Sequence, residues 1–359
     1  MRDSAGMLSL IAHRAFAAFL SGHGKRPEGA KDDYPASIGA QDWPVWPWQL
    51  IGLLALIDGA FLALGRAELT GSSWLYVMGS AGVAGLAMLG SGWLRSHALL
   101  CTLFRGIAFS ALAWPVLRIF NYLSMTIPFP MTDALLAQWD AALGFDWLGY
   151  LQWLNQYPPL LLLMDMTYTG LEKYAAAFFV LIALFPDSRH RCFELIALFV
   201  STAILSMVIG IFFPALAPMG YYAPDVSGLR MIDAGIGIYH IDNLAALREQ
   251  ASPLLNLSDM PGLVTFPSFH TAMGVVLIYV CRGNRTLFGI SLVINLLMIA
   301  ATPLFGSHYL VDLIGGVAVA LFAIAALRRA ERSHYAEVRP QGRLLVAATE
   351  RPVDSAAGP

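Results

Sequence analysis

Two histidines and one aspartate, His270, His308 and Asp312, are the residues whose types and spacing could perform chemistry. His308 and Asp312 are four residues apart at the start of an apolar segment, so on a helix they share one face. A carboxylate placed there accepts a hydrogen bond from one ring nitrogen, which fixes the tautomer and leaves the other nitrogen as a base or nucleophile. His270 follows Pro267-Ser268 at the start of another apolar segment, where it could donate a proton to a leaving oxygen.

Both groups lie at the starts of predicted helices, and helix N-termini favour a bound phosphate because their backbone N–H groups are unpaired. The residues therefore suit in-line displacement at phosphorus, with His308 as nucleophile, Asp312 as its orienting carboxylate and His270 as general acid. A histidine at a helix end is alternatively a satisfied polar residue, and two histidines with an aspartate could bind a divalent cation. No further histidine or carboxylate falls at a matching spacing, so neither a metal nor another cofactor is expected.

The elements that must position these residues are membrane helices. Of the 359 residues 57% are hydrophobic and only 13% are charged, whereas a soluble domain has about 25% charged residues. The net charge of −2 and the absence of a basic patch exclude a nucleic-acid partner. The sequence predicts an all-α, polytopic transmembrane bundle, in which each span needs about 20 apolar residues. Eight spans are expected, at about 48–65, 73–94, 98–125, 160–184, 191–213, 269–282, 286–305 and 308–328.

The distribution of Lys and Arg predicts the orientation of the spans, because cytoplasmic loops carry the excess of these residues. With the N-terminal tail inside, 16 of the 22 Lys and Arg residues fall on the cytoplasmic side and 3 on the other side. Both termini are therefore expected in the cytoplasm. The span after His270 leaves the outer face and the next span returns to it at His308. In a bacterium this places the protein in the inner membrane and the two histidines at the periplasmic face.

Two long loops are expected on that outer face. The first, at about 126–159, carries tryptophans and leucines that predict short helices in the membrane interface, where Trp and Tyr are enriched. The second, at about 214–268, is rich in Gly, Pro and Asp. Loops of this length in compact proteins are usually lids or binding surfaces, so both are expected to select the substrate.

The string Pro267-Ser268-Phe269-His270 resembles the P-S-x-H motif of the type 2 phosphatidic acid phosphatase (PAP2) superfamily. His308 and Asp312 resemble the end of its last motif, S-R-x5-H-x3-D. The longer run from Gly306 to Gly316 is most similar to the branch that includes inositol phosphorylceramide synthases. The specific motifs cover only residues 266–316.

The resemblance implies a phosphohistidine intermediate on His308, with Asp312 orienting the ring and His270 protonating the leaving group. Ser268 and Phe269 of the same motif are expected to lie against the phosphate. The resemblance also implies a catalytic core of six helices over residues 98–328. Around that core the sequence predicts a cytoplasmic segment at 1–47, two additional transmembrane helices at 48–97 and a disordered cytoplasmic tail at 329–359.

Two departures from the superfamily pattern concern positive charge. The first motif, K-x6-R-P, does not occur in the chain, and Ala301-Thr302 stand where the last motif has Ser-Arg. Those cations hold a phosphate monoester, whose charge is about −1.5 to −2 at neutral pH. A phosphodiester has a single negative charge and needs less compensation. The departures therefore favour an enzyme that acts on phosphodiesters over a simple monoester phosphatase.

Two arginines are candidates to replace the missing cations. Arg118 lies in the part of its predicted span nearest the histidines, although an arginine there can also extend to the membrane interface. Arg248 lies in the loop that leads to His270, where an exposed surface charge is the alternative.

Lys173 and Tyr168 are further candidates for binding substrate, both in the span 160–184. Lys173 adjoins Glu172, so an internal ion pair that holds helices together is the alternative for that residue. Three aspartates could contact the headgroup, although helix caps or solvated positions are the more usual roles for such residues. They are Asp133, Asp140 and Asp165.

The expected activity is the transfer of a phosphorylated headgroup from a glycerophospholipid to a lipid hydroxyl, with inositol phosphate and ceramide as the pair suggested by the nearest branch. The first alternative is a lipid phosphate or polyprenyl diphosphate phosphatase of the same superfamily, which uses water in place of the alcohol. The second is a non-catalytic transporter or scaffold in which the site has lapsed. Membrane lipids are the only partners expected, and the sequence does not indicate an oligomeric state.

Overall fold

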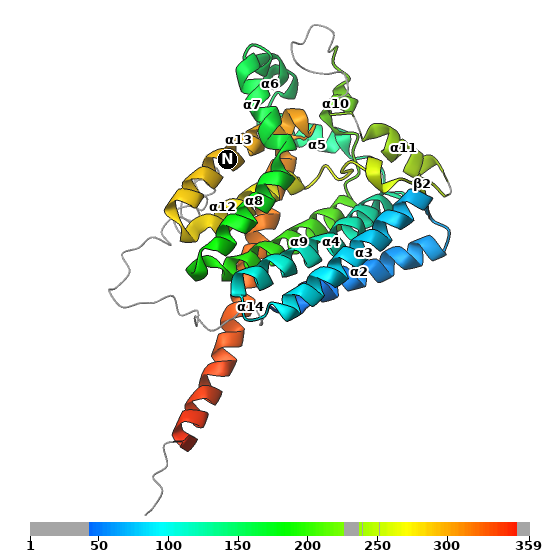
Figure 1. Ribbon diagram of the computed structural model, residues 1–359. Coiled ribbons are helices and arrows are strands. Elements are labelled where there is room, and N and C mark those ends of the chain that lie inside the picture. The colour runs from blue at the N-terminus through cyan, green and yellow to red at the C-terminus, as the bar shows by residue number, and fades with distance from the viewer. Residues whose placement is uncertain (1–42, 226–236, 239, 251, 350–359) are drawn as a thin grey trace, which may run out of the picture. The chain divides into compact units, whose positions relative to one another are not determined.

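The computed structural model describes residues 43–225, 237–238, 240–250 and 252–349, with side chains up to residue 332. The described chain is mostly helical (Figure 1), and its only sheet is one pair of two-residue strands. The strands are β1 (Glu68–Leu69) and β2 (Leu254–Leu255). The helices are α2 (Trp46–Ala63), α3 (Gly71–Trp93), α4 (Ala98–Met125), α5 (Asp133–Ala142), α6 (Trp147–Leu154), α7 (Pro158–Thr169), α8 (Leu171–Leu184), α9 (His190–Gly210), α10 (Ala217–Tyr222), α11 (Ile241–Glu249), α12 (Phe269–Val280), α13 (Arg285–Phe305) and α14 (Leu310–Thr349), with short 3-10 turns at Pro186–Ser188, Leu257–Asp259 and Cys281–Gly283.

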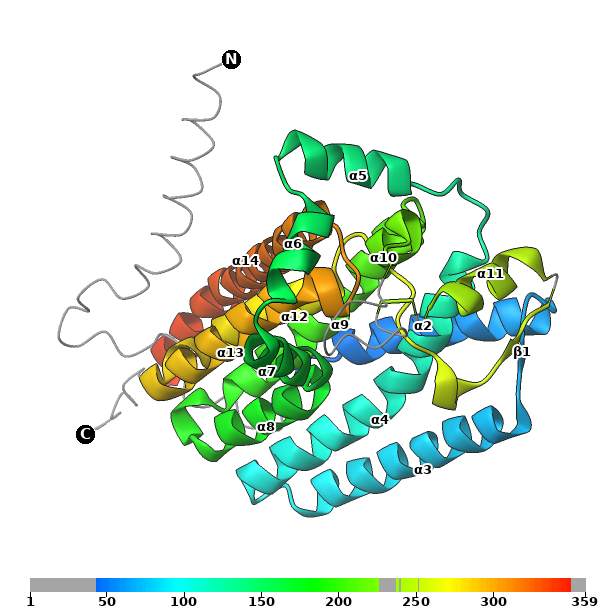
Figure 2. The same cartoon turned by 90° about the horizontal axis from the view of Figure 1, so that it is seen from above.

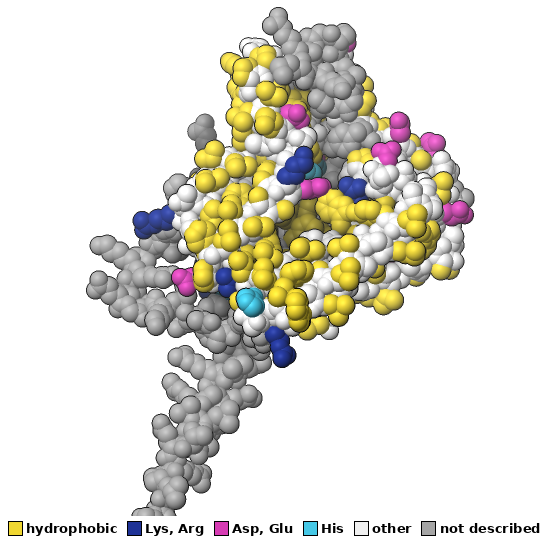
Figure 3. Space-filling model, viewed as in Figure 1, with side chains coloured by type: hydrophobic (Ala, Val, Ile, Leu, Met, Phe, Trp, Pro, Cys, Tyr) yellow, Lys and Arg dark blue, Asp and Glu magenta, His cyan; other side chains and the backbone are white. Residues whose placement is uncertain are grey.

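Six of the described helical segments are long and apolar enough to cross a membrane. They coincide with six of the eight predicted spans, and Figure 3 shows hydrophobic side chains covering much of the helical surface. The prediction of an all-α, polytopic membrane protein is therefore confirmed. The six segments are α2, α3, α4, Pro186–Gly210, α13 and Leu310–Arg332.

The two other predicted spans have a different form. The segment 160–184 is divided at Gly170 into α7 and α8. A Cβ atom added at Gly170 would lie 2.5 Å from the Met166 carbonyl oxygen, so the backbone at this division accepts only glycine. The segment 269–282 contains α12, which with the following turn covers only Phe269–Gly283 and is shorter than a full span.

The short helix α12 is the centre of the packing around the histidines. It contacts α9, α13 and α14 along its length, and α8 more weakly. Its completely buried side chains include Ala272, Val276 and Leu277. Because its neighbours supply the apolar surroundings, α12 does not need the length of a lipid-exposed span. Figures 1 and 2 show it among α9, α13 and α14.

The two N-terminal helices hold the loop that leads to His270. Strand β1, between α2 and α3, pairs in parallel with β2 in that loop. Ser73 near the start of α3 donates its hydroxyl to the Leu255 carbonyl at 3.2 Å and accepts the Leu257 N–H at 2.9 Å. The helices predicted as additions at 48–97 therefore support the entry to the P-S-x-H segment.

Helix α14 extends into the segment predicted as the C-terminal tail. The sequence predicts a disordered segment from residue 329, whereas helix α14 continues to Thr349. Most of the predicted cytoplasmic segment at 1–47 lies outside the described residues.

Candidate active site

His308 and Asp312 form a buried pair at the start of α14. The Nδ1 atom of His308 lies 3.1 Å from Oδ2 of Asp312, and the same oxygen accepts the Tyr309 N–H at 2.9 Å. Asp312 is completely buried, and only 4% of His308 is exposed. With the carboxylate on Nδ1, the Nε2 atom is the nitrogen left to react.

Burial sets the protonation state of His308. It lowers the pKa of the imidazole to about 4, and a hydrogen bond with the backbone of Thr265 acts in the opposite direction. The ring is therefore neutral near pH 7 and has the lone pair that a nucleophile needs.

The P-S-x-H segment lies directly against α14. Ser268 caps α12 by accepting the Thr271 N–H on its hydroxyl at 3.3 Å, and its own N–H donates to the Asp312 carbonyl at 2.9 Å. A Cβ atom added at Gly316 would lie 2.3 Å from the Ser268 carbonyl oxygen. Only glycine at this position lets the two helix starts approach so closely.

Tyr168 lies between His270 and the His308–Asp312 pair. The ring of Tyr168 at the end of α7 stacks on the His270 ring, with centroids 4.4 Å apart and planes 16° apart. A Cβ atom added at Gly306 would lie 2.5 Å from the Tyr168 hydroxyl oxygen and 2.6 Å from Cδ2 of His308. The hydroxyl and the nucleophile therefore border the same point, and His270 interacts electrostatically with His308. The structure brings together all three predicted catalytic residues and Tyr168.

Two of the predicted phosphate contacts have other roles in the structure. The Ser268 hydroxyl is fully buried and is used to cap α12. The Phe269 ring packs on Phe199 of α9, with centroids 5.9 Å apart, because it lies on the face of α12 directed at the helix core. The Ser268 N–H is bonded to the Asp312 carbonyl, so of these two residues the Phe269 N–H is the part that fits an anion.

The side chains of the two candidate arginines donate hydrogen bonds to loop carbonyls. Arg118 donates through Nη1 to the Leu257 carbonyl at 2.9 Å and lies over the Trp114 ring, 4.9 Å from its centroid. Arg248 of α11 donates through Nη2 to the Phe129 carbonyl. Both are half-buried. They stabilise the loops around the site.

Lys173 and Glu172 do not lie inside the bundle, where the internal ion pair was predicted. Both side chains are exposed, just after the division between α7 and α8. Glu172 interacts electrostatically with Arg118 and Lys173. Because the helix is divided at Gly170, these charges lie near the end of α8 that adjoins Tyr168 instead of in the middle of a span. Figure 3 shows basic, acidic and histidine side chains together at a hollow on this face.

Two aspartates of α5 are more important to the site than the sequence indicates. Asp140 accepts the N–H groups of Leu310 and Val311, and Asp133 accepts the Tyr309 hydroxyl. Capping was among the predicted roles for these aspartates, but its target, the start of α14, lies about 170 residues away in sequence. Their spacing of seven residues, which places both on one helix face, was the available signal.

A third histidine lies close to the site. His240, directly before α11, is 2% exposed, and its Nε2 atom lies 3.2 Å from the Leu216 carbonyl oxygen. It also interacts electrostatically with His308. A single histidine in a Gly-rich loop has no local signature, so no sequence pattern indicates its place beside the site. Among the described residues no group of three or more His, Cys, Asp or Glu side chains is arranged to hold a metal ion.

A family model of the PAP2 superfamily matches residues 134–326, more than half of the chain. The chain belongs to the PAP2 superfamily. The prediction of the superfamily is therefore confirmed, and its members catalyse phosphoryl transfer or hydrolysis. The match begins in α5 and ends in α14, so it contains His270, His308 and Asp312. No curated protein and no solved structure matches the chain.

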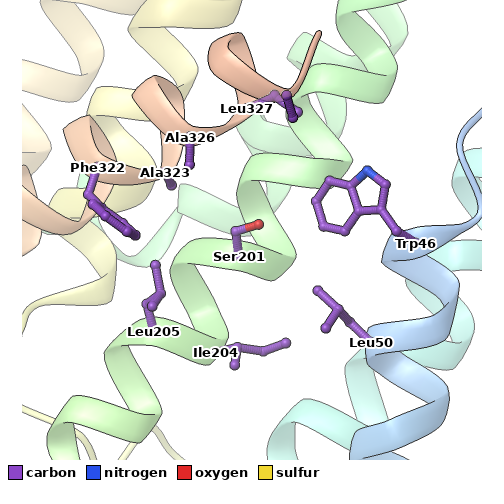
Figure 4. Close-up of a pocket in the computed structure, with 10 residues that line it drawn as sticks. Trp46, Leu50, Ser201, Ile204, Leu205, Phe322, Ala323, Ala326 and Leu327 are labelled. Carbon is purple, nitrogen blue, oxygen red and sulfur yellow. The ribbon is translucent and has the colours of Figure 1, made fainter. Parts of the chain in front are cut away.

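A cavity elsewhere in this PAP2 protein is too apolar to be the reaction site. It has a volume of about 370 Å³ and lies between α2, α9 and α14 (Figure 4). Its only side-chain hydroxyl group belongs to Ser201, which donates to the Ala197 carbonyl. The cavity is lined by Trp46, Leu50, Ser201, Ile204, Leu205, Phe322, Ala323, Ala326, Leu327 and Ala330.

Proposed function

We propose that this PAP2 protein is a membrane lipid phosphotransferase that moves a phosphorylated headgroup from a glycerophospholipid to a lipid hydroxyl. The observation that carries the proposal is the buried His308–Asp312 pair in a site without the superfamily's motif cations. Inositol phosphate is the proposed headgroup and ceramide the proposed acceptor, on the basis of the motif similarity around Gly306 to Gly316.

In the first step, Nε2 of His308 attacks the phosphorus atom of the donor. A P–N bond forms as the P–O bond to diacylglycerol breaks, and His270, in its protonated form, gives its proton to the leaving oxygen. Asp312 stabilises the positive charge that develops on the His308 ring through the 3.1 Å contact at Nδ1. The backbone N–H groups of Phe269 and His270, at the start of α12, stabilise the phosphoryl oxygens.

In the second step, the acceptor hydroxyl attacks the phosphohistidine. His270, now neutral, accepts the hydroxyl proton, a new P–O bond forms, and the P–N bond to His308 breaks. Both histidines return to their starting states, so the cycle needs neither a metal nor an oxidant. The stacking of His270 on Tyr168 supports this role because it fixes the plane of the ring that carries the proton.

The local charge favours a phosphodiester donor. Thr302, at the position of the motif arginine, is fully buried and donates its hydroxyl to the Met298 carbonyl at 2.9 Å. Arg118 and Arg248 donate to loop carbonyls. A phosphate monoester with a charge near −2 would have little direct compensation here, whereas a diester with one negative charge needs less.

The site is proposed to face the outer leaflet, with both termini in the cytoplasm. The excess of Lys and Arg on the other side of the predicted spans supports this orientation.

The direct test is to incubate purified protein in bilayers with labelled glycerophospholipids of different headgroups, with and without ceramide or other lipid alcohols. Mass spectrometry would follow diacylglycerol and the new phosphodiester. We expect both products only when an acceptor is present, and neither with His308→Ala. Release of phosphate from phosphatidic acid or a polyprenyl diphosphate, without an acceptor, would instead identify a phosphatase.

A further inference from the structure

Helix α5 connects the two loops that surround the candidate site. It follows Thr132, whose N–H donates to the Pro214 carbonyl at 2.8 Å, and its inner face carries Asp133, Leu136 and Asp140. All three of these side chains are buried, with exposed fractions of 4%, 0% and 2%. Figures 1 and 2 show α5 at the end of the bundle where α14 begins.

Asp140 caps the helix that carries the nucleophile pair. Its two carboxylate oxygens accept the N–H groups of Leu310 and Val311 at 2.8 and 2.9 Å. These are the first two residues of α14, whose N–H groups have no partner within the helix. His308 lies two residues before this cap and Asp312 one residue after it, so the cap fixes the backbone that sets their separation.

Asp133 connects the same turn to the second loop. One of its oxygens accepts the Tyr309 hydroxyl at 3.0 Å, and the other accepts the Leu216 N–H at 2.9 Å. Tyr309 is completely buried, and its own N–H donates to the Asp312 carboxylate. The four oxygens of Asp133 and Asp140 are thus all used, and three of them hold residues 309–311.

We propose that Asp133 and Asp140 are positioning residues, which hold the turn between α13 and α14 so that the His308–Asp312 pair keeps its reactive geometry. This inference rests on the proposed function for its catalytic consequence, because neither aspartate is part of the nucleophile pair. An ionised carboxylate suits the position for two reasons: it accepts two charge-assisted hydrogen bonds, and its charge is favourable at a helix N-terminus.

The test compares Asp140→Ala with Asp146→Ala. Asp146 is also a helix-capping carboxylate, but it is exposed and caps α6 through the Gly149 N–H at 3.0 Å. We expect Asp140→Ala to lower kcat by about 10- to 100-fold with little change in KM, since small misplacements of reacting groups have effects of this size. Asp140→Asn should lose less, because its one amide oxygen retains one of the two bonds. Asp146→Ala should retain wild-type kcat.

A second readout does not depend on the lipid reaction. Diethyl pyrocarbonate modifies accessible neutral histidines, and peptide mapping by mass spectrometry would give the rate for His308 separately. We expect a higher rate in Asp140→Ala and in Tyr309→Phe, which removes only the hydroxyl bond to Asp133, and the wild-type rate in Asp146→Ala. If Asp140→Ala does not fold, Asp140→Asn and Tyr309→Phe provide the same comparison.

The outcomes separate the two proposals. An inactive wild-type protein on every lipid substrate would contradict the proposed function, and the modification rates would still decide the role of α5. Unchanged kcat and an unchanged His308 modification rate in folded Asp140 and Tyr309 variants would overturn the positioning role. A change in KM alone would also overturn it, because that result would indicate a substrate contact.

Discussion

Replacement of Gly306 by alanine should disable the site without unfolding the protein. Gly306 follows α13, and an added Cβ atom would lie 2.5 Å from the Tyr168 hydroxyl oxygen and 2.6 Å from Cδ2 of His308. Ordinary contact begins at 3.4 Å, so the two atoms would have to move by about 0.9 and 0.8 Å. The Thr302 carbonyl oxygen, 3.0 Å from the added atom, prevents the alanine from moving away.

A displacement of this size has a large effect on a reacting group. A shift of about 1 Å can lower the rate by about 10²-fold, and overpacking in a well-packed region typically lowers stability by about 1 to 3 kcal/mol. We therefore expect Gly306→Ala to lose about two orders of magnitude in kcat while still showing a cooperative thermal transition. The assay is the transfer reaction in bilayers, followed by mass spectrometry, together with a thermal unfolding curve.

Gly289→Ala is the matched control. Gly289 lies within α13, the helix that Gly306 follows; it is exposed, and an added Cβ atom meets nothing within 4 Å. Alanine in a helix interior is favoured over glycine by about 0.5 to 1 kcal/mol, so this variant should be fully active and as stable as the wild type or more so. Wild-type kcat in Gly306→Ala would refute the close approach of Tyr168 and His308 on which the site is built.

Three further outcomes are expected. Because burial lowers the pKa of His308 to about 4, protonation of the nucleophile should reduce kcat/KM only as pH falls through about 4; a loss with a midpoint near 6.5, the usual value for histidine, would contradict the buried pair. Tyr168→Leu should lower kcat because it removes the ring that stacks on His270. Tyr168→Phe keeps this ring, so its kcat should be higher than that of Tyr168→Leu. Equal kcat values in the two variants would exclude the stacking role. Ser73→Ala should lower the free energy of unfolding by about 1 to 3 kcal/mol in a thermal unfolding experiment, since the buried Leu257 N–H loses its acceptor. Ser72 is exposed, so Ser72→Ala should have no measurable effect in the same experiment.

The convergence of His270, His308 and Asp312 could be predicted from local information. The interval between the histidines contains two apolar segments joined by a short basic link, so an antiparallel pair returns the chain to its starting face. The four-residue spacing then brings His308 and Asp312 together on one helix. These are consequences of helix periodicity and chain length, which do not depend on the rest of the fold.

The partners of the charged residues could not be predicted in the same way. Arg118 donates to Leu257 in a loop more than a hundred residues later, and Asp140 caps α14 across a similar separation. Such contacts depend on how irregular loops fold over the bundle, and no periodic pattern encodes that. The division of the fourth predicted span was missed for a related reason, because the apolar composition continues through Gly170 although its backbone does not remain in one helix.

The most direct test of the proposed mechanism is to detect the intermediate on His308. Protein incubated with a headgroup-labelled glycerophospholipid and no acceptor would be quenched under alkaline conditions, digested and mapped by mass spectrometry. We expect the labelled phosphoryl group on the peptide that contains His308, its loss with formation of a new phosphodiester when a lipid alcohol is added, and no adduct with His308→Ala. Product formation by His308→Ala at the wild-type rate, with no adduct in the wild-type protein, would contradict the phosphohistidine mechanism.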